Sequence, residues 1–231
     1  LWSSGTYNCT IDWGDSSTSA ITAYNDADLA HTYASAGDHD CTITNPTSFD
    51  GFYWNNGGDK TKITKLESWG AGAYDMASQR QFHGCANLVI TATDAPTIST
   101  TNFEYQFAWC AALTTIPGLG SWIDDSITNI SYMFYHCDAF NQDVSDWDVS
   151  NCTTFAALFN YCDVFNNGGV ALNWDGSAAD WAVTTMGSCF DEAFDFNQDI
   201  STWDVSSVTD CNWMFVKAYD FNQNLSAWDW D

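Results

Sequence analysis

Apolar and aromatic positions recur along most of this chain with a period of about 25 residues. One segment, from Phe140 to Ser150, returns almost unchanged in two later places, and each copy carries a Trp seven residues after its first Phe. The three copies occupy residues 140–150, 196–206 and 221–230. Because a fixed period of roughly 20 to 50 residues is typical of stacked repeat architectures, the pattern predicts about six coils of 25 residues each.

Each predicted coil has two halves with different spacing. Val144, Trp147 and Val149 follow the L-x-x-L-x-L spacing of a leucine-rich-repeat strand. The other half, from Ser150 to Phe159, places apolar residues at helical spacing after a polar cap, which predicts a short helix or 3₁₀ turn. We therefore expect a mainly β fold with short helices, a leucine-rich-repeat-like right-handed solenoid over residues 50–231.

Stacking such coils roughly 4.8 Å apart lines up equivalent side chains in columns. The Trp column falls on the inward apolar position, so we expect it in the core, and the alternative is a face that stacks on sugars. Neighbouring members of the Cys column come within reach of a disulfide, and the alternative is a ladder of free, buried thiols. The predicted columns are Trp122, Trp147 and Trp203; Phe134, Phe159, Phe190 and Phe215; and Cys85, Cys110, Cys137 and Cys162. The further cysteines expected in the core are Cys152, Cys189 and Cys211.

Residues 1–49 follow a different, two-residue alternation. Tyr7, Cys9 and Ile11 alternate with polar neighbours, as does the segment around Cys41, which predicts half-buried strands. We expect a small β-sandwich here. Cys9 and Cys41 are predicted to point inward from separate strands, where a disulfide between them is one interpretation.

Two families are similar to parts of the chain. The run from Thr10 to Asp15 and the later His31-Thr-Tyr-Ala34 resemble the PKD-type β-sandwich, with its first strand missing. Residues 50–231 resemble the BspA-like leucine-rich-repeat proteins, especially the F-N-Q-D-[IVL]-S-x-W-D-[VT]-S and M-F-x-x-C repeats of mycoplasma surface lipoproteins. The resemblance implies surface display and adhesion, and it brings no catalytic residue with it.

The composition adds a strong negative charge to this picture. Of the 231 residues, 30 are acidic and 5 are Lys or Arg, for a formal net charge of −25. Such a field repels nucleic acid and anionic membranes, while 45% hydrophobic and 16% aromatic residues argue against disorder. No apolar stretch is long enough for direct membrane insertion of this fragment. Because the chain begins at Leu1 inside a predicted strand, we expect an upstream signal, anchor or first strand.

The sequence holds neither a familiar catalytic motif nor a paired zinc motif, so we expect a protein that is not an enzyme and needs no cofactor. Calcium is the one ion left open. Asp148, Asp204 and Asp229 occupy equivalent positions, so stacking lines up like charges that either stay solvated or share a cation. Asp12 and Asp15 form a second acidic pair of this kind. The Asn-Gln-Asp triplets are expected to satisfy turn backbone as an amide ladder.

Two hypotheses about function follow. The first is an extracellular, surface-displayed recognition or adhesion module, on a cell or a virus particle, that binds a protein or glycan. The alternative is a structural assembly protein, a coat, sheath, filament or fibre subunit that binds copies of itself through the solenoid ends or edges. The loop-like insertion at 166–180 and the open last coil are the expected contact regions. The candidate binding residues are Asp146, Asp148, Trp174, Trp181, Asp204, Trp228 and Trp230.

Overall fold

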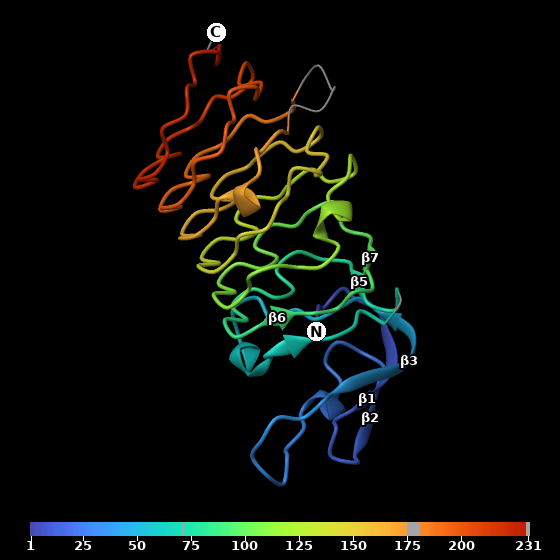
Figure 1. Cartoon of the computed structure of the whole chain (residues 1–231). Helices are drawn as coiled ribbons and strands as arrows, with labels where there is room; N and C mark the ends of the chain where they lie inside the picture. The colour runs from blue at the N-terminus through green and yellow to red at the C-terminus, as the bar shows by residue number, and fades with distance from the viewer. Residues whose placement is uncertain (71, 175–180, 230–231) are drawn as a thin grey trace.

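The computed structural model describes residues 1–70, 72–174 and 181–229 of the chain. Figure 1 shows an elongated molecule in which a small sheet near the N-terminal end is followed by a pile of successive coils that reaches the C-terminus at the other end. The fold is mainly non-helical with small sheets, and the described residues contain no helix longer than three residues. One hydrophobic core runs from Tyr7 to Trp228.

The regular elements are short, and most of the coil backbone lies outside them. The strands are β1 (Tyr7–Asp12), β2 (Thr18–Ile21), β3 (Thr42–Phe49), β4 (Lys65–Leu66), β5 (Asp75–Met76), β6 (Val89–Ile90) and β7 (Thr97–Ile98). The 3₁₀ helices are η1 (Ala27–Leu29), η2 (Lys60–Lys62), η3 (Leu119–Ser121) and η4 (Asn167–Gly169). Within the described ranges, none of these helices has the length or the apolar character needed to span a membrane.

Parallel pairing between successive coils links the strands and then continues as single bridges. β4 pairs with β6 and β5 pairs with β7, in both cases in parallel. Further along the stack the same relation is kept by isolated parallel bridges, Asn102–Asn129, Thr154–Thr185 and Thr185–Asp210. Each coil therefore meets the next coil in a fixed register.

The N-terminal strands form one antiparallel sheet in the order β2-β1-β3. Tyr7 and Cys9 on β1 are buried, as their alternation with polar neighbours predicts. Phe49, at the end of β3, packs against Phe52 and Tyr74 with ring centroids 5.4 and 5.6 Å apart. The sheet thus shares its core with the first coil. Where a sandwich of two sheets was expected, the described residues form a single three-stranded sheet.

The structure does not contain the Cys9–Cys41 disulfide that was one interpretation of the sequence: both thiols are free, and only Cys9 is buried. Cys41 lies just before β3, where Thr42 pairs with Asp12. Asp12 is three residues along β1 from Cys9, a separation of roughly 10 Å. The Cys41 thiol is exposed and lies 3.1 Å from the Tyr33 hydroxyl. The expectation that Cys41 points inward is therefore wrong.

The half-coil with L-x-x-L-x-L spacing forms turns where a strand was predicted. Asp143 accepts a hydrogen bond from the N–H of Ser145 at 2.9 Å, and Asp148 accepts one from the N–H of Ser150 at 3.1 Å. Such local side-chain bonds compete with regular secondary structure. The apolar residues of this half are nevertheless buried, so the spacing identified the core positions and not the backbone conformation.

The other half-coil also forms turns, so of the two alternatives predicted for it, a short helix or a 3₁₀ turn, the short helix is wrong. The N–H of Leu158 donates to Phe155 O at 3.2 Å, which is the i→i+3 bond of a 3₁₀-type turn. The N–H of Phe155 donates to Thr185 O at 2.8 Å, and the N–H of Phe159 donates to Cys189 O at 3.0 Å. These donors bond to the next coil, whereas an α-helix requires a carbonyl four residues back. The backbone N–H groups that an α-helix would need are therefore already bonded to the next coil.

Phe side chains form two columns through the coils, and the predicted Phe column is confirmed. Neighbouring rings of the first column lie 5.5–6.0 Å apart between centroids. Rings of the second column lie 5.7–6.1 Å apart, and the two columns touch at 3.8–4.2 Å. The first column is Phe82, Phe107, Phe134, Phe159, Phe190 and Phe215, and the second is Phe140, Phe165, Phe196 and Phe221.

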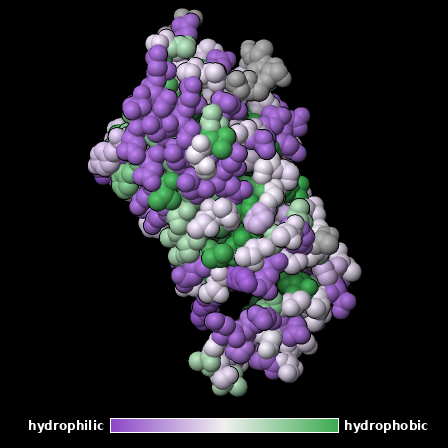
Figure 2. Space-filling model, in the orientation of Figure 1, coloured by the Kyte–Doolittle hydropathy of each residue, from purple (hydrophilic) through white to green (hydrophobic). Residues whose placement is uncertain are grey.

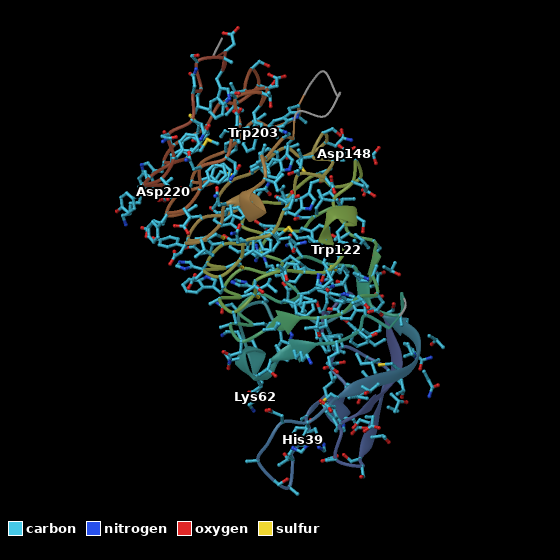
Figure 3. All side chains as sticks on the ribbon, viewed as in Figure 1. His39, Lys62, Trp122, Asp148, Trp203 and Asp220 are labelled. Atoms are coloured by element: carbon cyan, nitrogen blue, oxygen red, sulfur yellow. The ribbon has the colours of Figure 1, made fainter. Side chains whose placement is uncertain are left out.

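The tryptophans are buried as predicted, but Trp174 joins their column. Its ring lies 5.8 Å from Trp147 and 5.2 Å from Trp203. The indole N–H groups of Trp174 and Trp203 donate to backbone carbonyls of the preceding coil at 2.9 and 3.0 Å. Trp122 contacts Trp69 at 5.4 Å instead of extending this stack. Figure 3 shows Trp122 and Trp203 within the stack of coils.

The Cys column consists of free, buried thiols, so the second interpretation of these residues is the one that holds. The thiols of Cys110, Cys137 and Cys162 donate to the carbonyl of the column Phe in the preceding coil at 3.0–3.2 Å. Burial raises the pKa of the Cys85 thiol to about 12. The prediction that Cys211 is in the core is wrong, because its thiol is exposed.

Asn side chains form the predicted amide ladder along the turns. The side-chain oxygen of Asn141 accepts from the N–H of Asn166 at 3.0 Å, and that of Asn166 accepts from the N–H of Asn197 at 3.0 Å. The oxygen of Asn197 accepts from the N–H of Asn222 at 3.1 Å. Each amide thus satisfies a backbone donor of the next coil, which fixes the register of the stack.

Replacing a central column residue should cost more stability than replacing a terminal one. Phe159→Ala removes a fully buried ring with column neighbours on both sides, so we expect a loss of about 3–5 kcal/mol in the free energy of unfolding. Phe215→Ala, in the same column at the open end, should cost clearly less. Urea unfolding followed by Trp fluorescence measures both, and equal losses would contradict a continuous stack.

Thiol labelling should separate the nine cysteines by burial. In the native protein, Cys41 and Cys211 should react quickly with iodoacetamide, since they are exposed, and the buried Cys column should stay unmodified. In urea all nine should be alkylated. Peptide mass spectrometry identifies the sites, and a pair of cysteines that stays unlabelled in urea without reductant would reveal a disulfide.

Candidate ligand-binding surface

Six turns, one in each coil, form one long edge of the stack. Each turn surrounds a Phe of the first column and contains two residues in the left-handed region of φ. The first left-handed positions are Arg80, Tyr105, Tyr132, Ala157, Ser188 and Trp213, with φ between 51° and 64°. The second are Gly84, Trp109, His136, Tyr161, Glu192 and Lys217, with φ between 57° and 88°. Eleven of these twelve residues are not glycine, although this conformation costs such residues roughly 1 kcal/mol or more.

Hydrogen bonds to the next coil hold the turns in this conformation. In one turn the N–H groups of Tyr132, Phe134 and His136 donate to the next coil at 2.9–3.1 Å. The same alternate pattern recurs in the turns that begin at Ala157 and Ser188. The Phe side chain between the two left-handed residues enters the core, whereas Trp109 and Trp213 are 43% and 72% exposed. The turn geometry thus buries one ring and leaves its neighbours at the surface.

Aromatic rings gather at this edge. The ring of Tyr105 stacks on His83 at 5.4 Å and on Tyr132 at 4.5 Å. A second row begins at Trp109, whose ring stacks on His136 at 3.9 Å, and His136 stacks on Tyr161 at 4.0 Å. We call this set the aromatic edge: Tyr105, Trp109, Tyr132, Tyr135, His136, Tyr161 and Trp213.

The two basic residues of these turns are paired with carboxylates. Arg80 bonds Glu104 at 2.8 Å and lies over the Tyr105 ring at 4.9 Å from its centroid. Lys217 forms an ion pair with Glu192. Burial lowers the pKa of His136 below its usual value, which keeps this ring neutral at pH 7. The edge therefore offers rings and carboxylates.

A shallow hollow interrupts the aromatic edge. Ala157 and Ser188 occupy the first left-handed position in the two coils between Tyr132 and Trp213, so no ring fills that space. The resulting hollow has a volume of about 560 Å³. It is lined by Tyr132, Ala156, Thr185, Gly187, Ser188, Asp210, Asn212 and Trp213.

The acidic residues singled out from the sequence lie elsewhere. Asp146, Asp148 and Asp229 are exposed and Asp204 is partly exposed. Figure 3 shows Asp148 on the opposite side of the stack from Asp220, which follows the last of the six turns. These four side chains stay candidates for binding, but they are not part of the aromatic edge.

The described residues do not assemble a calcium site from these carboxylates. The coil that carries Trp174 separates the coils of Asp148 and Asp204, because Trp174 stacks between Trp147 and Trp203. Across the described ranges, no group of three or more His, Cys, Asp or Glu side chains is placed to hold a metal ion. Asp148 and Asp204 each cap a Ser N–H two residues ahead.

The N-terminal acidic pair also caps turns. Asp12 accepts from the N–H of Gly14 at 3.0 Å. Asp15 bonds the hydroxyl of Ser17 at 2.5 Å and lies 2.8 Å from His31 Nε2, and these partners lower its pKa to about 2. His31 in turn stacks on Trp13 at 4.8 Å. These residues stabilise the turn between β1 and β2.

The tryptophans proposed as exposed binding residues are mostly in the core. Trp174 and Trp181 are buried, and the indole N–H of Trp181 donates to Trp174 O at 3.0 Å. The expectation that they decorate an exposed loop is therefore wrong. Trp228 is 9% exposed, at the open end, and Trp230 lies outside the described residues.

Sequence reasoning missed the aromatic edge, although a signal was present. Tyr and Trp flank the buried Phe in the turns around Phe107, Phe134 and Phe215, at positions where a polar residue is more usual for a solvated turn. Their left-handed conformation, which turns them outward, is visible only in the structure.

Comparison with known proteins places the repeat region in a family. No curated protein and no solved structure matches the chain. A family described as "Mycoplasma protein of unknown function, DUF285" matches residues 75–180 and 170–231, which together span more than half of the chain. The chain therefore belongs to the DUF285 family of Mycoplasma proteins of unknown function.

Proposed function

We propose that this protein is an extracellular, surface-displayed recognition or adhesion module that binds a protein or glycan through its aromatic edge. The observation that carries the proposal is the row of rings at the left-handed turn positions, of which Trp109 and Trp213 are 43% and 72% exposed. Aromatic side chains that lie exposed next to one another on a protein surface are typical of interaction sites.

The proposal includes the architecture that presents this edge. In it, the stacked coils are a BspA-like, leucine-rich-repeat-like right-handed solenoid, and residues 1–49 are a PKD-like unit at its base. Membership of the DUF285 family and the 25-residue repeat support this assignment. Extended stacks of this kind present long surfaces on which neighbouring coils contribute equivalent positions.

The charge of the protein narrows the class of partner in this proposal. Figure 2 shows hydrophilic residues over most of the upper half of the stack on the side facing the viewer. Many of the carboxylates cap neighbouring backbone N–H groups, as Asp143, Asp148 and Asp210 do, and these hydrogen bonds hold their side chains in place. A net charge of −25 disfavours nucleic acid and anionic membrane as partners.

Binding screens with matched variants test the proposed function. The purified protein is applied to a glycan array and to a panel of extracellular proteins, and Trp109→Ala/Tyr132→Ala/Trp213→Ala should lose the binding that the wild type shows. Asp146→Asn/Asp148→Asn, at two exposed carboxylates that are not part of the aromatic edge, serves as the control and should bind as the wild type does. Circular dichroism checks that all forms are folded.

Two outcomes would contradict this proposal. One is a ligand whose binding survives the triple aromatic variant. The other is a ligand whose binding is lost in Asp146→Asn/Asp148→Asn instead, since that result would place recognition at these two carboxylates and not at the aromatic edge.

A second proposal is self-assembly through the open end of the stack. Within the described residues, Phe215 and Phe221 are the last members of the two Phe columns, and the coil that carries them has an apolar hollow of about 460 Å³. The hollow is lined by Cys211, Trp213, Met214, Phe215, Val216, Leu225 and Trp228. The other end of the stack is covered by the N-terminal sheet through Phe49, so two copies would meet with their open ends facing each other.

Light scattering behind size-exclusion chromatography tests this second proposal. A dimer should form and should strengthen with salt, because screening reduces the repulsion between two chains of charge −25. Leu225→Asp should return the protein to a monomer, whereas Val170→Asp, at an exposed valine elsewhere in the stack, should leave the dimer intact. A wild-type protein that stays monomeric at high salt would contradict self-assembly.

A further inference from the structure

We infer that the hollow between Tyr132 and Trp213 is a binding site for an uncharged oligosaccharide. This inference rests on the proposed recognition function and names its site and ligand class. The hollow contains what sugar recognition requires: aromatic faces for the C–H surfaces of sugar rings, and polar groups for their hydroxyls.

The two rings stand at equivalent positions of coils three steps apart. Coil spacings of roughly 4.8 Å place them about 14 Å from each other. Tyr132 is held by stacking on Tyr105 at 4.5 Å, so its orientation is fixed before a ligand arrives. Trp213 is 72% exposed and free to receive a sugar on its face. This separation suits a ligand of several sugar units better than a single sugar.

The surface of the hollow between the Tyr132 and Trp213 rings, which we call its floor, is low because the residues there are small. Ala156, Gly187 and Ser188 line it, and a Cβ added to Gly187 would lie 3.4 Å from Asp210 Oδ2 and 3.5 Å from Asn212 O. Any larger side chain at Gly187 would therefore rise into the hollow. The short side chains, repeated in two successive coils, leave room for a ligand to lie along the stack.

Polar groups on this floor are held in place by the bridges between coils. Thr185 pairs with Thr154 and with Asp210 in a parallel ladder. Asp210 Oδ1 accepts the N–H of Asn212 at 3.0 Å, and the N–H of Ser188 donates to Asn212 O at 2.8 Å. A fixed carboxylate accepts strong hydrogen bonds from sugar hydroxyls, since charge-assisted bonds are stronger than neutral ones.

The electrostatics select against acidic sugars. Asp210 lines the hollow, and the nearest basic residue on the turns, Lys217, is paired with Glu192. With a net charge of −25 over the whole chain, a sulfated or uronic acid ligand would meet repulsion at long and at short range. An apolar peptide would cover the polar groups of Thr185, Asp210 and Asn212 without giving them hydrogen-bond partners. A neutral, hydroxyl-rich ligand remains the best match.

The inference is tested with immobilised full-length protein and soluble oligosaccharides of three kinds: neutral, sulfated and amino-substituted. Neutral oligosaccharides should bind more tightly than sulfated ones, which the negative field repels. Tyr132→Ala and Trp213→Ala should each weaken that binding about tenfold, the loss expected when one stacking contact is removed. Gly187→Val should abolish binding by filling the floor while both rings remain.

Tyr219→Ala is the matched control. Tyr219 is 74% exposed and stacks on Phe194 at 5.5 Å, so it is an exposed aromatic residue of the stack that does not line the hollow. This variant should bind neutral oligosaccharides as the wild type does. Thermal melting confirms that each variant is folded before binding is compared.

The outcomes separate this inference from the proposed function. Neutral oligosaccharides that bind equally well to Tyr132→Ala and Gly187→Val would overturn the site and leave a recognition function in place. Preference for sulfated or amino-substituted sugars would overturn the ligand class. Capture of a defined protein through the aromatic edge, with no sugar bound, would overturn this inference alone. No ligand on any screen would overturn both.

Discussion

Backbone hydrogen bonds between neighbouring coils are the interaction on which this fold depends. Alternate N–H groups of each turn donate to the next coil, and the buried Phe rings contact the rings above and below. One coil by itself would leave both its backbone groups and its apolar face without partners. The register must therefore be kept throughout. Phe159 and Phe190 are 31 residues apart in sequence, yet their rings stack at 5.9 Å, and Trp174 from the same long coil joins the Trp column.

The same constraint creates the surface. Holding each turn against the next coil places two residues per turn in the left-handed conformation, with one Phe between them directed inward. The inward position must stay Phe for the column, whereas the outer positions tolerate Tyr, Trp, His, Ala, Ser, Glu and Lys. A repetitive core thus supports a variable edge. Differences in chemistry from coil to coil, such as the change from Tyr132 to Ala157, are where specificity for a ligand would arise.

The acidic character of the protein is compatible with this architecture because many of its carboxylates have a structural role. Asp side chains cap turn N–H groups in several coils. Asn side-chain oxygens accept hydrogen bonds from backbone N–H groups of the next coil, which fixes the register between the two coils. The remaining charge keeps molecules apart at low salt and biases binding towards uncharged or basic ligands. The proposed sugar site and the proposed open-end contact both operate within that field, and they use different coil surfaces apart from Trp213.

The sequence by itself determined the repeat length, the Phe and Cys columns and the Asn ladder, because in a stack of similar coils equivalent positions along the chain become neighbours in space. It did not determine the backbone of each half-coil: the spacing suggested a strand and a helix, but bonds to the next coil and to local Asp side chains produced turns. Only the tertiary structure decided that Trp174 and Trp181 are buried and that Cys41 is exposed and apart from Cys9. It also brought Tyr132 and Trp213 to the two ends of one hollow, since residues from coils three apart meet only through the register of the whole stack.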